Sequence, residues 1–212
     1  MKIIIITPEE DIRHELETVN DLLKNGLQRL HLRKSEYDTG DYRKYIKAID
    51  EQYHPRLVLT GSYELYNEFN LGGIHLNTSA RRDEALRKKL SHLPQPIFST
   101  SFHTWQKIVE NDFHYGYVFI SPVFDSISKK EYKANIDPYG AGETKQKLAK
   151  MNKYCPELYG LGGVGIKEIE ALQEYGFDGG AMLGSLWMSG NPVATFLRAT
   201  NVAAMSERQN AA

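Results

Sequence analysis

The stretch YVFISPVFDSISKK, residues 117–130, joins an apolar strand to a loop of hydroxyls and lysines. Residues 117–120 are apolar on both faces, which is typical of a strand buried in a parallel sheet. Pro122 ends the pairing, because proline has no N–H to donate to a neighbouring strand. The polar groups that follow lie where ligands bind in α/β sheets and barrels, just past the carboxyl end of a strand. We expect three of them to contact an anionic substrate: Ser126, Ser128 and Lys129.

Similar apolar runs recur along the chain, separated by stretches with helical spacing and good helix formers. We expect strands over residues 2–7, 29–33, 57–60, 73–76, 97–100, 117–121, 158–162 and 179–183. A doubly wound sheet would also alternate in this way, but eight regular strands fit closure better. Residues 1–200 are therefore predicted to form a single (β/α)8 TIM barrel of the α/β class. Residues 201–212 are small and polar, and we expect a flexible C-terminal tail.

The composition of the chain limits the kinds of partner that we expect it to bind. The 212 residues include 26 Lys and Arg against 27 Asp and Glu, so no overall field selects nucleic acid or an acidic membrane. The single cysteine, Cys155, permits no internal disulfide and fits a reducing cytoplasm. No apolar run reaches membrane length. We expect a cytoplasmic protein whose partner is a small-molecule phosphate, and for which a homodimer is possible because dimers are the commonest assembly.

Polar residues follow most of the predicted strands and would line one pocket. The second strand delivers His31, Arg33 and Lys34 to this pocket, and we expect all three to bind substrate. Ser101, which follows the fifth strand, is expected to do the same, and nearby His103 is the candidate acid or base. His75 alternates with apolar neighbours and is interpreted as a core histidine instead.

Glycines follow the last two strands and are predicted to bind phosphate through exposed backbone N–H groups. The alternative is that they only permit tight turns. The predicted phosphate-binding residues are Gly162, Gly163, Gly184 and Ser185. A metal site built from the histidines is disfavoured, because no carboxylate completes it and their spacing matches no ligand pattern. We therefore predict no cofactor from these residues.

Six short motifs follow one another along the chain, from the second predicted strand to the eighth. They are HLRKS (31–35), GIHL (73–76), SFHT (101–104), SPVFDSISK (121–129), GGV (162–164) and GFDGGA (176–181). Together they resemble the thiamine-phosphate synthase and TenI family of (β/α)8 barrels, and the likeness covers nearly the whole chain. The resemblance implies an enzyme of thiamine biosynthesis that binds a thiazole phosphate.

In the synthase branch, the resemblance implies that a hydroxymethylpyrimidine diphosphate is joined to the thiazole phosphate with release of pyrophosphate. Mg²⁺ then holds the diphosphate through one acid after the third strand and another after the fourth. Here those positions fall on Thr60-Gly61 and on residues 77–80, and both acids are missing. Asp83 or Glu84 would replace one of them only if the loop is shifted.

In the TenI branch, the resemblance implies a metal-free proton transfer that aromatises a thiazole phosphate carboxylate tautomer. A histidine that matches His103 moves the proton, and the glycine motifs hold the phosphate. Because the missing acids belong to the metal site, the sequence favours a thiazole tautomerase (isomerase). The alternatives are a thiamine-phosphate synthase (transferase) that needs Mg²⁺ and a regulator that binds thiazole phosphate without changing it.

Overall fold

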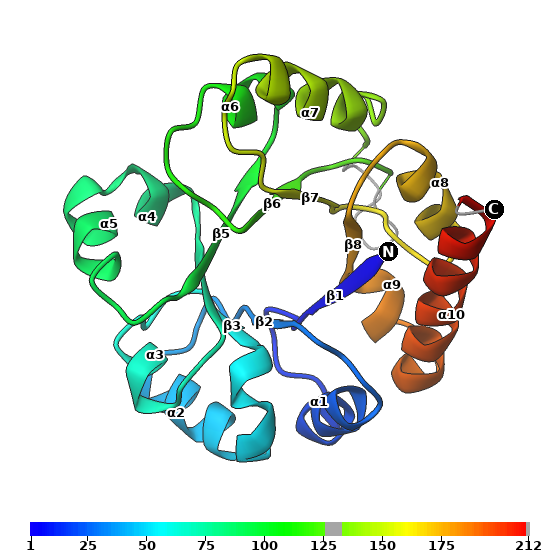
Figure 1. Ribbon diagram of the computed structural model, residues 1–212. Coiled ribbons are helices and arrows are strands. Elements are labelled where there is room, and N and C mark those ends of the chain that lie inside the picture. The colour runs from blue at the N-terminus through cyan, green and yellow to red at the C-terminus, as the bar shows by residue number, and fades with distance from the viewer. Residues whose placement is uncertain (126–132, 211–212) are drawn as a thin grey trace. The chain divides into compact units, whose positions relative to one another are not determined.

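The computed structural model describes residues 1–125 and 133–210, and its strands are arranged in chain order around a closed barrel (Figure 1). The predicted (β/α)8 barrel is confirmed, and every predicted strand is present. The strands are β1 (Lys2–Ile6), β2 (Leu30–Leu32), β3 (Leu57–Leu59), β4 (Gly73–Leu76), β5 (Ile97–Phe102), β6 (Tyr117–Ile120), β7 (Glu157–Gly160) and β8 (Gly179–Met182).

Helices lie between the strands, and polar side chains fix several of their first turns. The Asp38 carboxylate accepts a hydrogen bond from the N–H of Asp41 at the start of α2, and Asn77 caps α4 in the same way. No helix in the part of the chain that the structure describes is long and apolar enough to cross a membrane. The helices are α1 (Glu15–Lys24), α2 (Thr39–Lys47), the 3-10 helix η1 (Glu51–Arg56), α3 (Leu65–Glu68), α4 (Thr78–Arg82), α5 (Glu84–Leu90), α6 (Trp105–Val109), α7 (Gly140–Lys150), α8 (Glu168–Glu174), α9 (Gly184–Trp187) and α10 (Pro192–Asn210).

Residue contacts divide the chain into two units, residues 5–100 and residues 1–4 with 101–212. In the unit of residues 5–100, β2, β3, β4 and β5 pair in parallel, with His31 opposite Val58 and His75 opposite Ser99. Apolar residues such as Leu30 and Ile74 are fully buried there. The same interior also holds buried polar side chains, namely those of Thr7, His31, His75, Ser99 and Thr100.

In the unit of residues 1–4 and 101–212, β6, β7 and β8 pair in parallel. Its core is aromatic: the ring centroids of Tyr117 and Tyr159 are 5.4 Å apart, and Phe119 packs edge-on against both. The 201–210 segment continues α10 as a helix, which the prediction of a polar tail did not anticipate. Ala203, Ala204 and Met205 are good helix formers, and Ala203 is buried. Flexibility of the tail stays a prediction.

Candidate functional site

In the unit of residues 5–100, Thr7 ties the end of β1 to the residues that follow β2. The Arg33 N–H donates to the Thr7 hydroxyl at 2.8 Å, and the Thr7 N–H donates to the carbonyl of His31 at 2.9 Å. The Arg33 side chain is 48% exposed and forms an ion pair with Glu9. Its guanidinium therefore lies just past β2 on a fixed backbone, as expected for a substrate-binding residue. That role stays a prediction.

Lys34, the next residue, is buried and points into a polar cluster. Its ammonium lies 2.7 Å from the Glu15 carboxylate and 3.0 Å from that of Asp11, and it also donates to the Glu10 carbonyl. Tyr45 donates to the other oxygen of Glu15 at 2.6 Å. The hydrogen bonds from Tyr37 and Lys34 lower the pKa of Asp11, which keeps this carboxylate ionised. Lys34 thus has a full set of partners in this conformation, and its assignment to substrate binding stays a prediction.

His31 and His75 face each other inside the same unit, with ring centroids 5.2 Å apart in an edge-on arrangement. His75 Nδ1 lies 2.9 Å from the Ser99 hydroxyl, which confirms the interpretation of His75 as a satisfied core histidine. Burial, followed by the charges of Arg33 and Arg81, lowers the pKa of His75 to about 3. Burial, followed by His75, also holds the pKa of His31 well below its usual value. Both rings are therefore neutral at pH 7. Substrate binding by His31 stays a prediction.

Arg81, on α4, is a candidate that the sequence analysis missed. Its Nη1 lies 3.5 Å from the Thr100 hydroxyl, which in turn donates to the carbonyl of Leu76 at 2.6 Å. This places the guanidinium beside the carboxyl ends of β4 and β5. The sequence signal was weak, because Arg82 is adjacent and nothing in the spacing says which of the two arginines faces the strands.

In the unit that contains residues 101–212, His103 is exposed beyond the end of β5. Its Nδ1 lies 2.7 Å from the carbonyl oxygen of Ser121. A carbonyl only accepts hydrogen bonds, so Nδ1 must carry the proton, and Nε2 is the basic nitrogen of the neutral ring. The Ser121 N–H donates to the Phe102 carbonyl. This hydrogen bond joins the end of β5 to the residue after β6, and so holds His103 next to Ser121. Ser101 is half-buried near the end of β5. The catalytic role of His103 and the binding role of Ser101 stay predictions.

The glycines after β7 form a turn with positive φ that packs on the loop after β6. Gly162 and Gly163 have φ of 91° and 67°, and a Cβ on Gly163 would lie 2.3 Å from the carbonyl oxygen of Asp125. The N–H of Phe124 donates to the carbonyl of Gly162 at 3.1 Å. The Ser126, Ser128 and Lys129 assignments, which continue this β6 loop, lie outside the described residues.

The start of α9 joins this turn through a side chain. The Ser185 hydroxyl donates to the carbonyl of Val164 at 2.5 Å, so the loops after β7 and β8 are held together. Gly184 and Ser185 form the first turn of α9, where backbone N–H groups have no partner within the helix. The structure thus brings the four predicted phosphate-binding residues into one region of this unit. Phosphate binding there stays a prediction.

The residues at the two expected metal-binding positions do not fit Mg²⁺. Gly61 has no side chain, and Ala80 is buried and apolar. The nearby carboxylates are already used: Asp83 caps α5 by accepting from the Leu86 N–H, and Glu64 accepts from Thr39. Within residues 1–125 and 133–210, no three His, Cys, Asp or Glu side chains are grouped to hold a metal.

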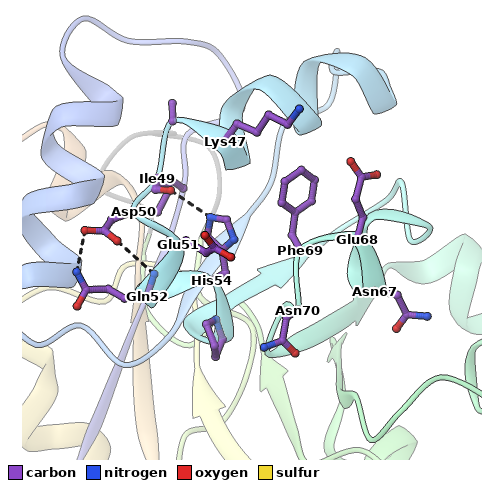
Figure 2. Close-up of a pocket in the computed structure, with 12 residues that line it drawn as sticks. Lys47, Ile49, Asp50, Glu51, Gln52, His54, Asn67, Glu68, Phe69 and Asn70 are labelled. Atoms are coloured by element: carbon purple, nitrogen blue, oxygen red, sulfur yellow. Dashed lines mark hydrogen bonds between the residues drawn. The ribbon is translucent and has the colours of Figure 1, made fainter.

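A hollow of about 740 Å³ lies elsewhere in the unit of residues 5–100 (Figure 2). It is lined by the end of α2, by η1 and by the end of α3, which precede the amino ends of β3 and β4. Two of its polar side chains have internal partners: Asp50 accepts two hydrogen bonds from Gln52, and His54 Nε2 lies 3.1 Å from the carbonyl of Ile49. The hollow contains none of the predicted site residues, and its contacts are those of a helix junction.

The fold is a (β/α)8 barrel, a class in which active sites lie in the loops after the strands. The family described as "TMP-TENI: Thiamine monophosphate synthase" matches residues 3–186, and the chain belongs to this family. It is accordingly an enzyme of thiamine biosynthesis.

Curated relatives and solved structures agree with this assignment. Thiamine-phosphate synthase of Flavobacterium johnsoniae is 24% identical over 188 residues, which cover 86% of this chain and 87% of the relative. The Bacillus mycoides enzyme of the same name is 24% identical over 82% of this chain and 79% of its own. A crystal structure of thiamine phosphate pyrophosphorylase from Bacteroides thetaiotaomicron is 26% identical, with a TM-score of 0.73 over 97% of this chain and 98% of that one. The Pyrococcus furiosus pyrophosphorylase, 14% identical with a TM-score of 0.76 over 97% and 96% of the two chains, shares the fold.

Proposed function

We propose that this enzyme is a thiamine-phosphate synthase that joins a hydroxymethylpyrimidine diphosphate to a thiazole phosphate. The observation that carries the proposal is the likeness to the Bacteroides thetaiotaomicron pyrophosphorylase, at 26% identity over 97% of the chain. The curated relatives reported above have the same name. The comparisons therefore favour the transferase over the tautomerase that the missing acids had suggested.

In this reaction the thiazole nitrogen forms a bond to the pyrimidine methylene, while the bond from that carbon to the diphosphate oxygen breaks. The bonding electrons leave with the diphosphate, so a cation beside it stabilises the transition state. Arg33 supplies a guanidinium past the end of β2. The turn at Gly162 and Gly163 and the first turn of α9 would hold the thiazole phosphate through backbone N–H groups. Binding energy from that phosphate then orients the ring that reacts.

The thiazole tautomerase is the second candidate, and two observations favour it. Gly61 and Ala80 supply no acids for Mg²⁺, and His103 presents Nε2 as a base because Nδ1 donates to Ser121. A neutral imidazole with one basic nitrogen can accept a proton from the thiazole ring. This reaction needs neither the diphosphate nor a metal.

One set of assays separates these functions. The purified enzyme is given thiazole phosphate and the pyrimidine diphosphate, with Mg²⁺ or with EDTA, and thiamine phosphate and pyrophosphate are measured. Both products at a catalytic rate support the synthase. Their absence, together with turnover of the thiazole carboxylate tautomer in EDTA, would replace it with the tautomerase. Thiazole phosphate binding without any turnover would indicate the regulator.

The His103→Gln variant tests the second candidate more closely. If His103 moves the proton, we expect tautomerase turnover to fall by about 10²–10⁴-fold while thiazole phosphate still binds. His92→Gln is the matched control, since His92 is an exposed histidine remote from any predicted site residue in the sequence. Equal turnover by the two variants would contradict a role for His103 in proton transfer.

A further inference from the structure

The peptide group between Val164 and Gly165, in the turn after β7, is held at both ends by side chains from two helices. Its carbonyl accepts a hydrogen bond from the Ser185 hydroxyl on α9 at 2.5 Å. Its N–H donates to the Glu168 carboxylate on α8 at 3.0 Å. Because a peptide group is planar, contacts at its carbonyl and at its N–H fix the orientation of the whole group. The direction of this turn therefore depends on two side chains.

The hydroxyl of Ser185 is used entirely by this contact as a donor. A hydroxyl carries one proton, and the Val164 carbonyl can only accept, so the proton of Ser185 lies on the line to Val164. The same hydroxyl cannot at once donate to a phosphate oxygen. The backbone N–H of Ser185 lies in the first turn of α9 and has no partner within the helix. It is therefore the main chain of this residue, and not its side chain, that can donate to an anion.

The same turn is attached on its other side to the loop after β6. The Phe124 N–H donates to the Gly162 carbonyl at 3.1 Å, and a Cβ on Gly163 would lie 2.3 Å from the Asp125 carbonyl oxygen. The two glycines have no side chain with which to hold the turn against α9. The hydrogen bond of Ser185 makes that link, between residues 21 positions apart in the chain. It thus connects the two sets of backbone N–H groups that are predicted to bind phosphate.

We propose that Ser185 is a positioning residue, whose hydroxyl holds the turn after β7 at the distance from α9 at which backbone N–H groups of both bind one phosphate group. Glu168 fixes the other end of the same peptide. The spacing matters because a misplacement of about 1 Å can cost about 100-fold in activity. This inference rests on the proposed function in one respect, that thiazole phosphate is the substrate, and the synthase and the tautomerase share that substrate.

The test is calorimetric titration of the full-length enzyme with thiazole phosphate. We expect Ser185→Ala to raise the dissociation constant about tenfold, as loss of one hydrogen bond implies, while the number of binding sites stays the same. Ser189→Ala is the matched control and should bind like the wild type, because the Ser189 hydroxyl donates at 2.6 Å to the nearby Leu186 carbonyl and joins no second loop. Equal weakening by the two variants would overturn the proposal. Fewer sites at an unchanged dissociation constant would also overturn it, since that is the result of a purely structural loss.

Steady-state kinetics give a second readout in whichever assay shows turnover. Ser185→Ala should raise KM for thiazole phosphate by about the same factor and leave kcat nearly unchanged, because it removes binding that the ground state and the transition state share. A fall in kcat at constant KM would contradict the positioning role.

A second variant covers the case in which Ser185→Ala fails to fold. Ser185→Cys keeps a side chain of the same shape, but its thiol is a weaker donor, so we expect an intermediate dissociation constant for thiazole phosphate. The urea unfolding midpoint of each variant is measured before titration. If folded Ser185→Cys binds thiazole phosphate like the wild type, the hydroxyl is not needed and the proposal is wrong.

The outcomes separate this inference from the synthase proposal. Thiazole phosphate binding that depends on Ser185, without any thiamine phosphate formed, would remove the synthase function and leave the positioning role. Thiamine phosphate formation with the same KM for thiazole phosphate in the wild type and in Ser185→Ala would leave the synthase and remove the positioning role. A wild-type enzyme that does not bind thiazole phosphate would remove both.

Discussion

At the scale of single residues, the buried pair of Lys34 and Glu15 is the most consequential contact beside the predicted site. Their side chains are 1% and 5% exposed. We expect Lys34→Met to reduce the free energy of unfolding by about 3–5 kcal/mol, because it leaves the Glu15 carboxylate buried without its cation. The double variant Lys34→Met/Glu15→Met should lose much less free energy of unfolding than the two single variants together, because neither charge is then buried without its partner. Urea denaturation of the four proteins measures this coupling.

An exposed pair gives the matched control for that prediction. Lys44 lies 3.3 Å from Asp41 on α2, and the two side chains are 82% and 44% exposed. Lys44→Met should change stability little, since exposed ion pairs of this spacing contribute little. If Lys34→Met and Lys44→Met reduce the free energy of unfolding by similar amounts, burial of the Lys34 ion pair does not increase its contribution to stability, and the prediction is wrong.

At the scale of elements, the turn after β7 is shaped by how closely it approaches the loop after β6. Gly163 has φ of 67°, and an added Cβ would meet the Asp125 carbonyl oxygen at 2.3 Å and the Phe124 Cβ at 2.7 Å. We expect Gly163→Ala to cost at least about 2 kcal/mol of stability, because the left-handed backbone costs about 1–2 and the two loops must then separate. Weaker thiazole phosphate binding should accompany this loss.

Gly26→Ala is the control that separates the cost of a positive φ from the cost of the steric clash at Gly163. Gly26 also has a positive φ, of 98°, but a Cβ there would meet nothing within 4 Å. Its substitution therefore introduces backbone strain without a clash. Denaturation midpoints of the two variants give the comparison, and a loss for Gly26→Ala as large as that for Gly163→Ala would argue against tight packing of the two loops.

Elements were easier to predict from the sequence than the contacts between them. Every strand could be predicted because a buried strand is a run of apolar residues in the sequence, as in residues 117–120. Lys34 shows what the sequence did not reveal: its ammonium lies beside the carboxylates of Glu15 and Asp11, which belong to another segment of the chain. Arg81 could not be chosen over Arg82, because its position depends on Thr100, which is far away in the sequence. The Ser185 contact with Val164 depends on a distant segment in the same way.

At the scale of the whole molecule, the buried histidines couple stability to pH. Burial is the largest cause that keeps both imidazoles neutral in the folded protein. The positive charges of Arg33 and Arg81 act in the same direction on His75. In the unfolded chain each histidine regains a pKa of about 6.5. Above that value neither state binds a proton, so these residues add no pH dependence. Below it, and down to the folded pKa of about 3 for His75, only the unfolded chain becomes protonated.

The free energy of unfolding should therefore fall as the pH is lowered from 7.5 to 5.5, with a limiting slope of about 1.4 kcal/mol per pH unit for each of the two histidines. His75→Asn removes one of these protonation sites, so the pH dependence of its unfolding should be about half as steep, whatever its stability at pH 7.5. His92→Asn, at an exposed position, should keep the wild-type slope. Urea denaturation of the three proteins across this range gives the slopes. If His75→Asn and the wild type lose stability in parallel, the pKa of His75 is not depressed in the folded protein, and the two arginines do not act on a neutral imidazole.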